Sequence, residues 1–181
     1  MSKKYKDDYE CKLIEKDDGS VEEQIVYKGN YYLNDLSKVQ TKHLTVTAFI
    51  SSFFTLWLFF VSGFFDNGGS HCLYVMIPYI CIFLPAIYFL LSAFQVWQAP
   101  AQLTREKYDK SFGRCKRMPK IIMVLSVLSI ICEFIFMLIN RKTILPENEW
   151  LFCCFLAVLA VVNYIFLKFN KNSFECIKIQ E

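Results

Sequence analysis

Several features of common enzymes are missing from this 181-residue sequence. Glycine is scarce, with six residues against 18 phenylalanines, and no glycine-rich phosphate loop occurs. No Cys-x-x-Cys pair appears among the eight cysteines, so neither a zinc site nor a thioredoxin-like motif is indicated. A Ser/His/Asp set and a paired carboxylate site are also missing, and His43 and His71 flank the first apolar run on opposite sides. We therefore expect no enzyme, no cofactor and no metal.

Residues 1–43 lack the apolar core and small-residue cleavage site of a signal peptide. Ser2 stands where N-myristoylation requires glycine. We therefore expect the first membrane-spanning helix to direct insertion, without a leader or a lipid anchor.

Charged residues are nearly missing from the long apolar runs as well. Of 20 basic and 17 acidic side chains, only Glu133 lies deep inside such a run.

What the sequence has in quantity is apolar surface. It is 55% hydrophobic with a mean hydropathy of +0.31, and a chain of this length cannot bury four long apolar helices in a soluble core. A hydrocarbon layer about 30 Å thick takes about 20 helical residues. The sequence therefore predicts an all-α integral membrane protein, a four-helix transmembrane bundle over residues 44–170. The predicted helices are 44–65, 72–98, 121–140 and 150–169, and the second is long enough to require a tilt or a kink.

Lysine and arginine near the helix ends predict the orientation. The loop before the third helix is rich in them, which places both termini in the cytoplasm, and we expect a bacterial cytoplasmic membrane, with a eukaryotic endomembrane as the alternative. These basic residues should orient the protein and attract anionic lipid head groups. Nucleic acid is not an expected partner. The expected head-group contacts are Arg105, Lys107, Lys110, Arg114, Lys116 and Arg117.

The cytoplasmic segments contain strand signals. Asp18-Gly19 is a strong turn signal between two apolar pairs, which predicts a β-hairpin over residues 9–28. The tail, 171–181, contains a β-branched stretch that would add a third strand to the hairpin. A short helix is expected over 34–43 with Asn34 as its N-cap, and another from a Thr104 cap to Gly113.

Small and polar residues recur along one face of each predicted helix. In lipid, helices associate through close packing and polar contacts, so these faces should form the interior of the bundle. The predicted faces are Thr45, Ala48, Ser52, Thr55, Phe59 and Ser62; Pro78, Cys81, Pro85, Tyr88, Ser92 and Gln95; Ser126, Ser129, Glu133, Met137 and Asn140; and Cys153, Ala157, Ala160 and Tyr164 next to Asn163.

Glu133 should therefore point inward, where desolvation disfavours its charged form. At its depth we expect Thr55 or Trp57, Cys81 or Tyr79, and Cys154 or Ala157. Pro85 removes one helical amide and frees the Cys81 carbonyl, and we expect a protonated Glu133 to donate to that carbonyl. Two interpretations stay open: an acid that fixes helix register, and a proton or cation site.

The sequence predicts a non-enzymatic multi-pass protein that acts as a scaffold or subunit of a larger membrane complex. Most polar residues face the cytoplasm, so recognition of a protein partner or a second copy is expected there. One alternative is a small proton- or cation-coupled transporter or channel that uses Glu133. A further alternative is a membrane thiol oxidoreductase, since Cys72 lies on the same membrane side as Cys153 and Cys154 and a Cys72–Cys153 bridge is geometrically allowed.

Overall fold

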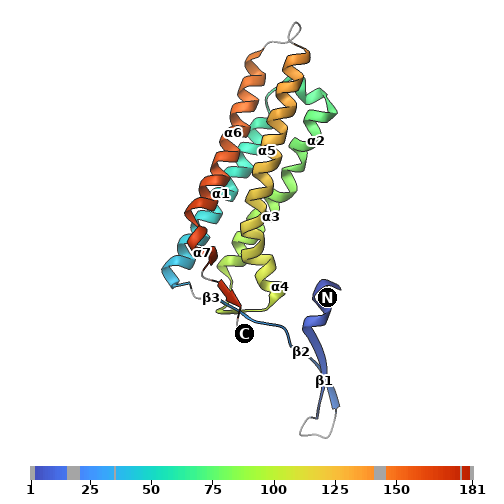
Figure 1. Cartoon of the computed structure of the whole chain (residues 1–181), viewed down its shortest axis with the longest axis vertical. Coiled ribbons are helices and arrows are strands. Elements are labelled where there is room, and N and C mark those ends of the chain that lie inside the picture. Colours follow the sequence, from blue (N-terminus) through green and yellow to red (C-terminus); the bar gives the residue numbers. More distant parts are fainter. Residues whose placement is uncertain (1–2, 16–20, 35, 141–145, 176, 180–181) are drawn as a thin grey trace.

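The structure is a computed structural model that describes residues 3–15, 21–34, 36–140, 146–175 and 177–179. Four long helical segments lie side by side in a bundle, with the strands gathered at one end (Figure 1). Each segment is long and apolar enough to cross a membrane, as the sequence predicted. They are α1 (Lys38–Gly63), α2 with α3 (Leu73–Cys81, Phe83–Trp97), α4 with η3 and α5 (Arg105–Tyr108, Asp109–Gly113, Arg114–Ile139), and α6 (Pro146–Phe169).

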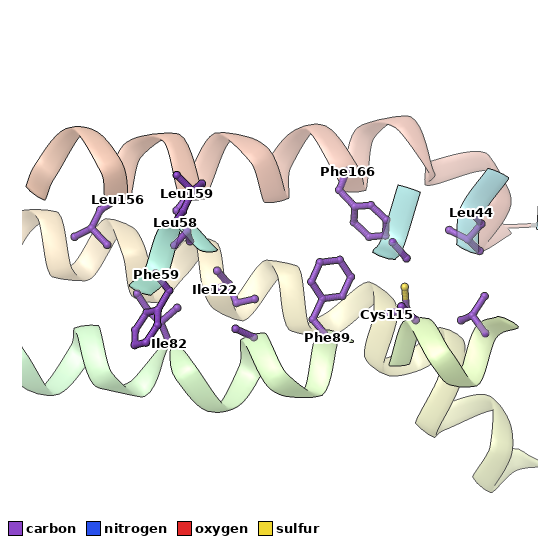
Figure 2. Packing of buried hydrophobic residues seen from close by; sticks show 14 of the residues in the cluster. Leu44, Leu58, Phe59, Ile82, Phe89, Cys115, Ile122, Leu156, Leu159 and Phe166 are labelled. Carbon is purple, nitrogen blue, oxygen red and sulfur yellow. The ribbon is translucent and has the colours of Figure 1, made fainter. Parts of the chain in front are cut away.

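The bundle interior is filled by large apolar side chains as well as small ones. α1 packs against α3 and α6, and α5 packs against α6, α3 and α2. Figure 2 shows Ile82, Phe89, Ile122, Leu159 and Phe166 meeting between the helices, and all five are at most 2% exposed. Most other large apolar side chains point outward, as a lipid-facing surface requires.

The second spanning segment is interrupted at Ile82, close to Pro85, where the sequence predicted a kink. α2 ends at Cys81 and α3 begins at Phe83. Pro85 has no amide to bond the Cys81 carbonyl four residues earlier, so the hydrogen-bond ladder is interrupted there. Buried residues nevertheless recur at steps of three and four through the break, at Val75, Pro78, Ile82, Ala86 and Phe89.

The third spanning segment is helical over a longer range than expected. Thr104 caps α4 as predicted, because its hydroxyl accepts from the Lys107 amide. Gly113 does not end the helix, however; a single π turn, η3, continues directly into α5. Side chains hydrogen-bond to backbone carbonyls around this wider turn. The Ser111 hydroxyl donates to Lys107 O at 2.7 Å, and Arg117 Nε donates to Gly113 O at 3.1 Å.

The predicted hairpin is present. β1 (Tyr9–Glu15) and β2 (Val21–Tyr27) pair antiparallel, in register from Tyr9–Tyr27 to Glu15–Val21. The tail strand, β5 (Ile177–Ile179), does form, but it does not join the hairpin. It follows the short helix α7 (Lys171–Glu175) and pairs with β3 (Tyr32–Asn34), which also pairs with β4 (Gln102–Leu103). This second sheet lies against the bundle, whereas the hairpin projects from it (Figure 1).

Helix α1 begins later than the short helix expected over 34–43, and it runs into the first span without a break. Asn34, the expected cap, is the last residue of β3. Ser37 caps instead: its Oγ accepts from the Gln40 amide at 3.2 Å, and the Gln40 side chain accepts from the Ser37 amide at 3.0 Å. This reciprocal Ser-x-x-Gln pattern satisfies two otherwise free amides, which a lone Asn cap does not.

Candidate functional site

Glu133 lies inside the bundle with no exposed surface. It is near the end of α5 away from the strands, where the turn η2 (Gly68–His71) covers the helix ends; we call this the capped end. The carboxyl group touches the backbone of Gly69 so closely that a Cβ added there would lie 2.3 Å from Glu133 Oε2. A side chain at position 69 would therefore force the Glu133 carboxyl to move.

A second acid meets Glu133 under the same turn. Glu149, in the first turns of α6, is 1% exposed, and its Oε1 accepts from the Gly68 amide at 2.7 Å. Asn67, immediately before η2, is 2% exposed and lies beside Glu133. The three polar side chains come from three separate segments. We call Glu133, Glu149 and Asn67 the capped-end cluster.

The cluster is poorly supplied with hydrogen bonds. Although Glu149 and Asn67 lie near the Glu133 carboxyl, the geometry leaves both Glu133 oxygens without a hydrogen-bond partner in the described part of the chain. The same holds for Glu149 Oε2 and Asn67 Nδ2. Buried polar atoms are normally paired with protein or ordered water, so this group of unpaired atoms is unusual.

The expected partners of Glu133 are arranged differently. Cys81 is exposed and Pro85 half-buried, and neither Glu133 oxygen bonds the Cys81 carbonyl. Tyr79 Oη donates to Phe59 O at 2.5 Å, across α1 and α2. Thr55 is buried but accepts from Asn163 Nδ2 at 3.0 Å, on α6. Ser126 and Ser129 are buried on the same face as Glu133, and their hydroxyls donate to carbonyls of their own helix.

The predicted inward face is correct for α1 and only partly correct for the other three segments. All six α1 residues are buried, as are Ser126, Ser129 and Glu133 of α5, whereas Met137 and Asn140 are half-buried. On the second segment, Cys81 and Tyr88 are exposed, and the buried residues are Pro78, Ile82, Ala86 and Phe89. On α6, Ala157 and Tyr164 are exposed while Leu156, Leu159 and Asn163 are buried. On α6, leucine rather than alanine therefore fills the interior.

Glu149, Asn67 and the Gly68-Gly69 pair were not among the predicted site residues. Glu149 was placed in the loop before a helix starting at residue 150, whereas α6 starts at Pro146. Proline at the first helical position is a recognised start signal. Glu149 lies four residues before Cys153, on the same face of α6. The sequence therefore contains the signal for a paired carboxylate site, contrary to the expectation that none occurs.

A cavity of about 160 Å³ adjoins the capped-end cluster. Asn67 forms part of its wall, so the cavity reaches the residue that contacts Glu133. The hydroxyls of Ser62, Ser70 and Tyr79 come from residues that also line it. The space is sufficient for several water molecules at about 30 Å³ each. The cluster is thus next to a partly polar compartment rather than to sealed hydrocarbon.

The six basic residues expected to contact head groups differ in their neighbours. Lys110 pairs with Glu106, Arg117 with Asp109 and Arg105 with Asp8. Two others lie over aromatic rings, with Arg114 5.2 Å from the Tyr88 centroid and Lys116 6.0 Å from that of Phe174. Lys107 is exposed. Five of these six basic side chains therefore lie next to an acidic or aromatic side chain of the protein itself.

The cysteines near the capped end are free thiols. No disulfide joins Cys72, Cys153 or Cys154, so the allowed Cys72–Cys153 bridge is not formed. Cys153 is buried and Cys154 exposed, so the vicinal pair faces two environments.

Comparison with known proteins finds no matching family model, no matching curated protein and no matching solved structure.

Proposed function

We propose that this protein is a non-enzymatic membrane subunit or scaffold that binds a partner protein through its β1–β2 hairpin. One observation carries the proposal. The hairpin projects from the bundle (Figure 1) as a sheet of only two strands, so that neither outer edge is paired in the described part of the chain. A two-stranded hairpin is only marginally stable in water, and unpaired edges offer main-chain groups to an added strand.

The base of the hairpin is fixed, which distinguishes it from a loose tail. Tyr5 is buried, and its hydroxyl donates to Asp109 Oδ2 at 3.0 Å. Tyr27 Oη accepts from the Arg105 amide at 3.0 Å and donates to Asn30 O at 2.9 Å. Partial burial raises the pKa of the Tyr27 phenol, so its hydroxyl remains a donor. The strands are thus held at a defined place beside α4.

The free part of the hairpin has apolar side chains available. Ile25 is 63% exposed and pairs in register with exposed Cys11. Strand addition uses main-chain hydrogen bonds for affinity and such side chains for specificity. We propose that this face lies on the cytoplasmic side of a bacterial cell membrane, because the segment before the third span is rich in basic residues. Lys107 and its basic neighbours then face anionic lipid head groups.

The test is co-purification of the full chain in mild detergent, with matched variants at one exposed position. Ile25→Thr keeps a β-branched residue and its amide, whereas Ile25→Pro removes the amide and breaks the strand. We expect the partner to be retained by Ile25→Thr and lost by Ile25→Pro, with the same elution volume for the bundle. Retention of the partner after residues 9–27 are replaced by a Gly/Ser linker would refute the proposal. If the protein recovered is a differently tagged copy of the same chain, the partner is a second copy.

A second candidate is a small proton- or cation-coupled transporter or channel. The capped-end cluster favours it, because an acid buried in a membrane helix commonly marks a transport site. Proton- or cation-dependent flux into liposomes that Glu133→Gln abolishes, while exposed Asp66→Asn leaves it intact, would support this function. The thiol oxidoreductase has less support, since Cys153 and Cys154 face different surroundings; activity lost on changing both to Ser would revive it.

A further inference from the structure

Two buried carboxyl groups meet at the capped end without a basic partner. Glu133 and Glu149 come from α5 and α6, and both are at most 1% exposed. None of the ion pairs in the described part of the chain involves either of them. His71, the last residue of the covering turn, and Asp66 are exposed side chains that lie 4.0 Å apart. A buried negative charge that lacks a counter-charge is costly.

Both carboxyl groups lie against the Gly68-Gly69 turn. The Gly69 backbone lies against the Glu133 carboxyl, and the Gly68 amide donates to one Glu149 oxygen. Three of the four carboxyl oxygens have no hydrogen-bond partner among the described residues. Asn67 is an independent indication, because its buried amide nitrogen is also unpaired.

Shared protons would satisfy only part of this arrangement. One proton between two carboxyl groups neutralises one charge and pairs two of the oxygens. A hard divalent cation neutralises both charges and takes several oxygens at once. Carboxamide oxygens are also ligands for such cations, and the Asn67 amide presents oxygen in place of nitrogen when it turns over.

We propose that Glu133, Glu149 and Asn67 bind one hard divalent cation, of the Ca²⁺ and Mg²⁺ class, beneath the Gly68-Gly69 turn. No group of three or more His, Cys, Asp or Glu ligands occurs in the described residues, which argues against a closed transition-metal site. Mg²⁺ is commonly held by one or two carboxylates and keeps several waters, and Ca²⁺ also accepts waters. The cavity of about 160 Å³ beside Asn67 provides space for them.

The bound cation would fasten the capped end. It would join α5, α6 and the segment before η2, which are otherwise linked there by Glu149 to the Gly68 amide and by Asn148 to the Asp66 carbonyl at 2.9 Å. The inference is separate from the hairpin proposal, which concerns the opposite end of the molecule.

The experiment uses the full-length protein in detergent micelles, stripped with chelator and dialysed against Ca²⁺ or Mg²⁺ up to about 10 mM, since modules outside the cytosol bind Ca²⁺ at about 0.1–1 mM. We expect one bound ion per chain and a Tm that rises with ion concentration. Glu133→Gln and Glu149→Gln keep the side-chain shape and remove one charge each. Each should weaken binding by about 100-fold or more, beyond the usual effect of a group that only orients a ligand.

Asp66→Asn is the matched control, because it removes an acid from the same loop whose side chain is 95% exposed. It should leave the bound ion and the Tm response unchanged. Absence of a bound divalent ion in the unaltered protein would overturn the inference, whatever the variants do. So would binding that survives in the Glu133→Gln/Glu149→Gln pair, binding lost equally in Asp66→Asn, or a site filled by Na⁺ or by protons alone.

Discussion

Replacing Gly69 by alanine tests the close approach on which the capped end depends. The added Cβ would lie 2.3 Å from Glu133 Oε2, 2.5 Å from Oε1 and 2.7 Å from Cδ. Ordinary contact begins near 3.4 Å, so the carboxyl must move by about 1 Å inside a packed site. Such overpacking costs about 1–3 kcal/mol. The loss of backbone freedom in the unfolded chain offsets about 0.4–1 kcal/mol, so we expect Gly69→Ala to lower the free energy of unfolding by about 1–2 kcal/mol.

Gly68 is the matched control, one residue earlier in the same turn. A Cβ there would lie 3.2 Å from Phe136 Cζ and 3.3 Å from Glu149 Oε1, which requires shifts of only a few tenths of an ångström. Gly68→Ala should therefore be nearly neutral, within about 0.5 kcal/mol. Both variants are measured by reversible unfolding of the micellar protein in mixed detergent, followed by circular dichroism.

A double-mutant cycle identifies the clash. Glu133→Ala removes the carboxyl that the new methyl would meet, so Gly69→Ala should cost much less in that background, with a coupling of about 1–3 kcal/mol. Glu133→Gln keeps the same volume and should give no such relief. A neutral Gly69→Ala, or additive effects with Glu133→Ala, would refute the placement of this acid against the turn.

Three further substitutions test single contacts by the same unfolding measurement. Asn163→Leu should cost about 0.6–1.7 kcal/mol, because it removes the buried bond to Thr55; a further loss from adding Thr55→Val would contradict that pairing. Tyr79→Phe should cost up to about 1 kcal/mol, because it removes one of the two hydroxyls that donate to the Phe59 carbonyl, the other being Ser62 Oγ at 2.9 Å; no change would mean that Ser62 alone satisfies this carbonyl. Ser37→Ala should cost about 1 kcal/mol and fray the start of α1; unchanged helicity would show that the cap is dispensable.

The overall architecture was accessible from the sequence because its signals are long. A span needs about 20 apolar residues, and a shift of a few residues at either end does not hide it. The Asp18-Gly19 turn likewise predicted the hairpin, and Pro85 predicted the break in the second segment. The start of α6 was placed four residues late, since a helix start depends on a few local residues. That small error put Glu149 outside the helix and hid the second acid of the site.

The partners of Glu133 were predicted incorrectly for a related reason. The expected bond to the Cys81 carbonyl assumed that Cys81 lies on the inward face of the segment. The buried residues run through Pro78, Ile82 and Ala86 instead, so Cys81 is exposed. The loop that actually covers Glu133 contains two glycines, which have no side chain to form a periodic pattern. Only the three-dimensional approach of Gly69 to the carboxyl shows why the loop is built this way.

The rule that small and polar residues mark the packed face also has a physical limit. It holds on α1, where Ser52 and Thr55 are fully buried, because a small residue permits close approach of two backbones. It does not hold on α6, where Leu156 and Leu159 are buried while Ala157 faces outward. Leucine gains no solvation energy by leaving lipid, but it gains dispersion contacts in a well-packed interior. Polarity therefore located the acid, while dispersion contacts favour the large apolar residues that share the interior with it.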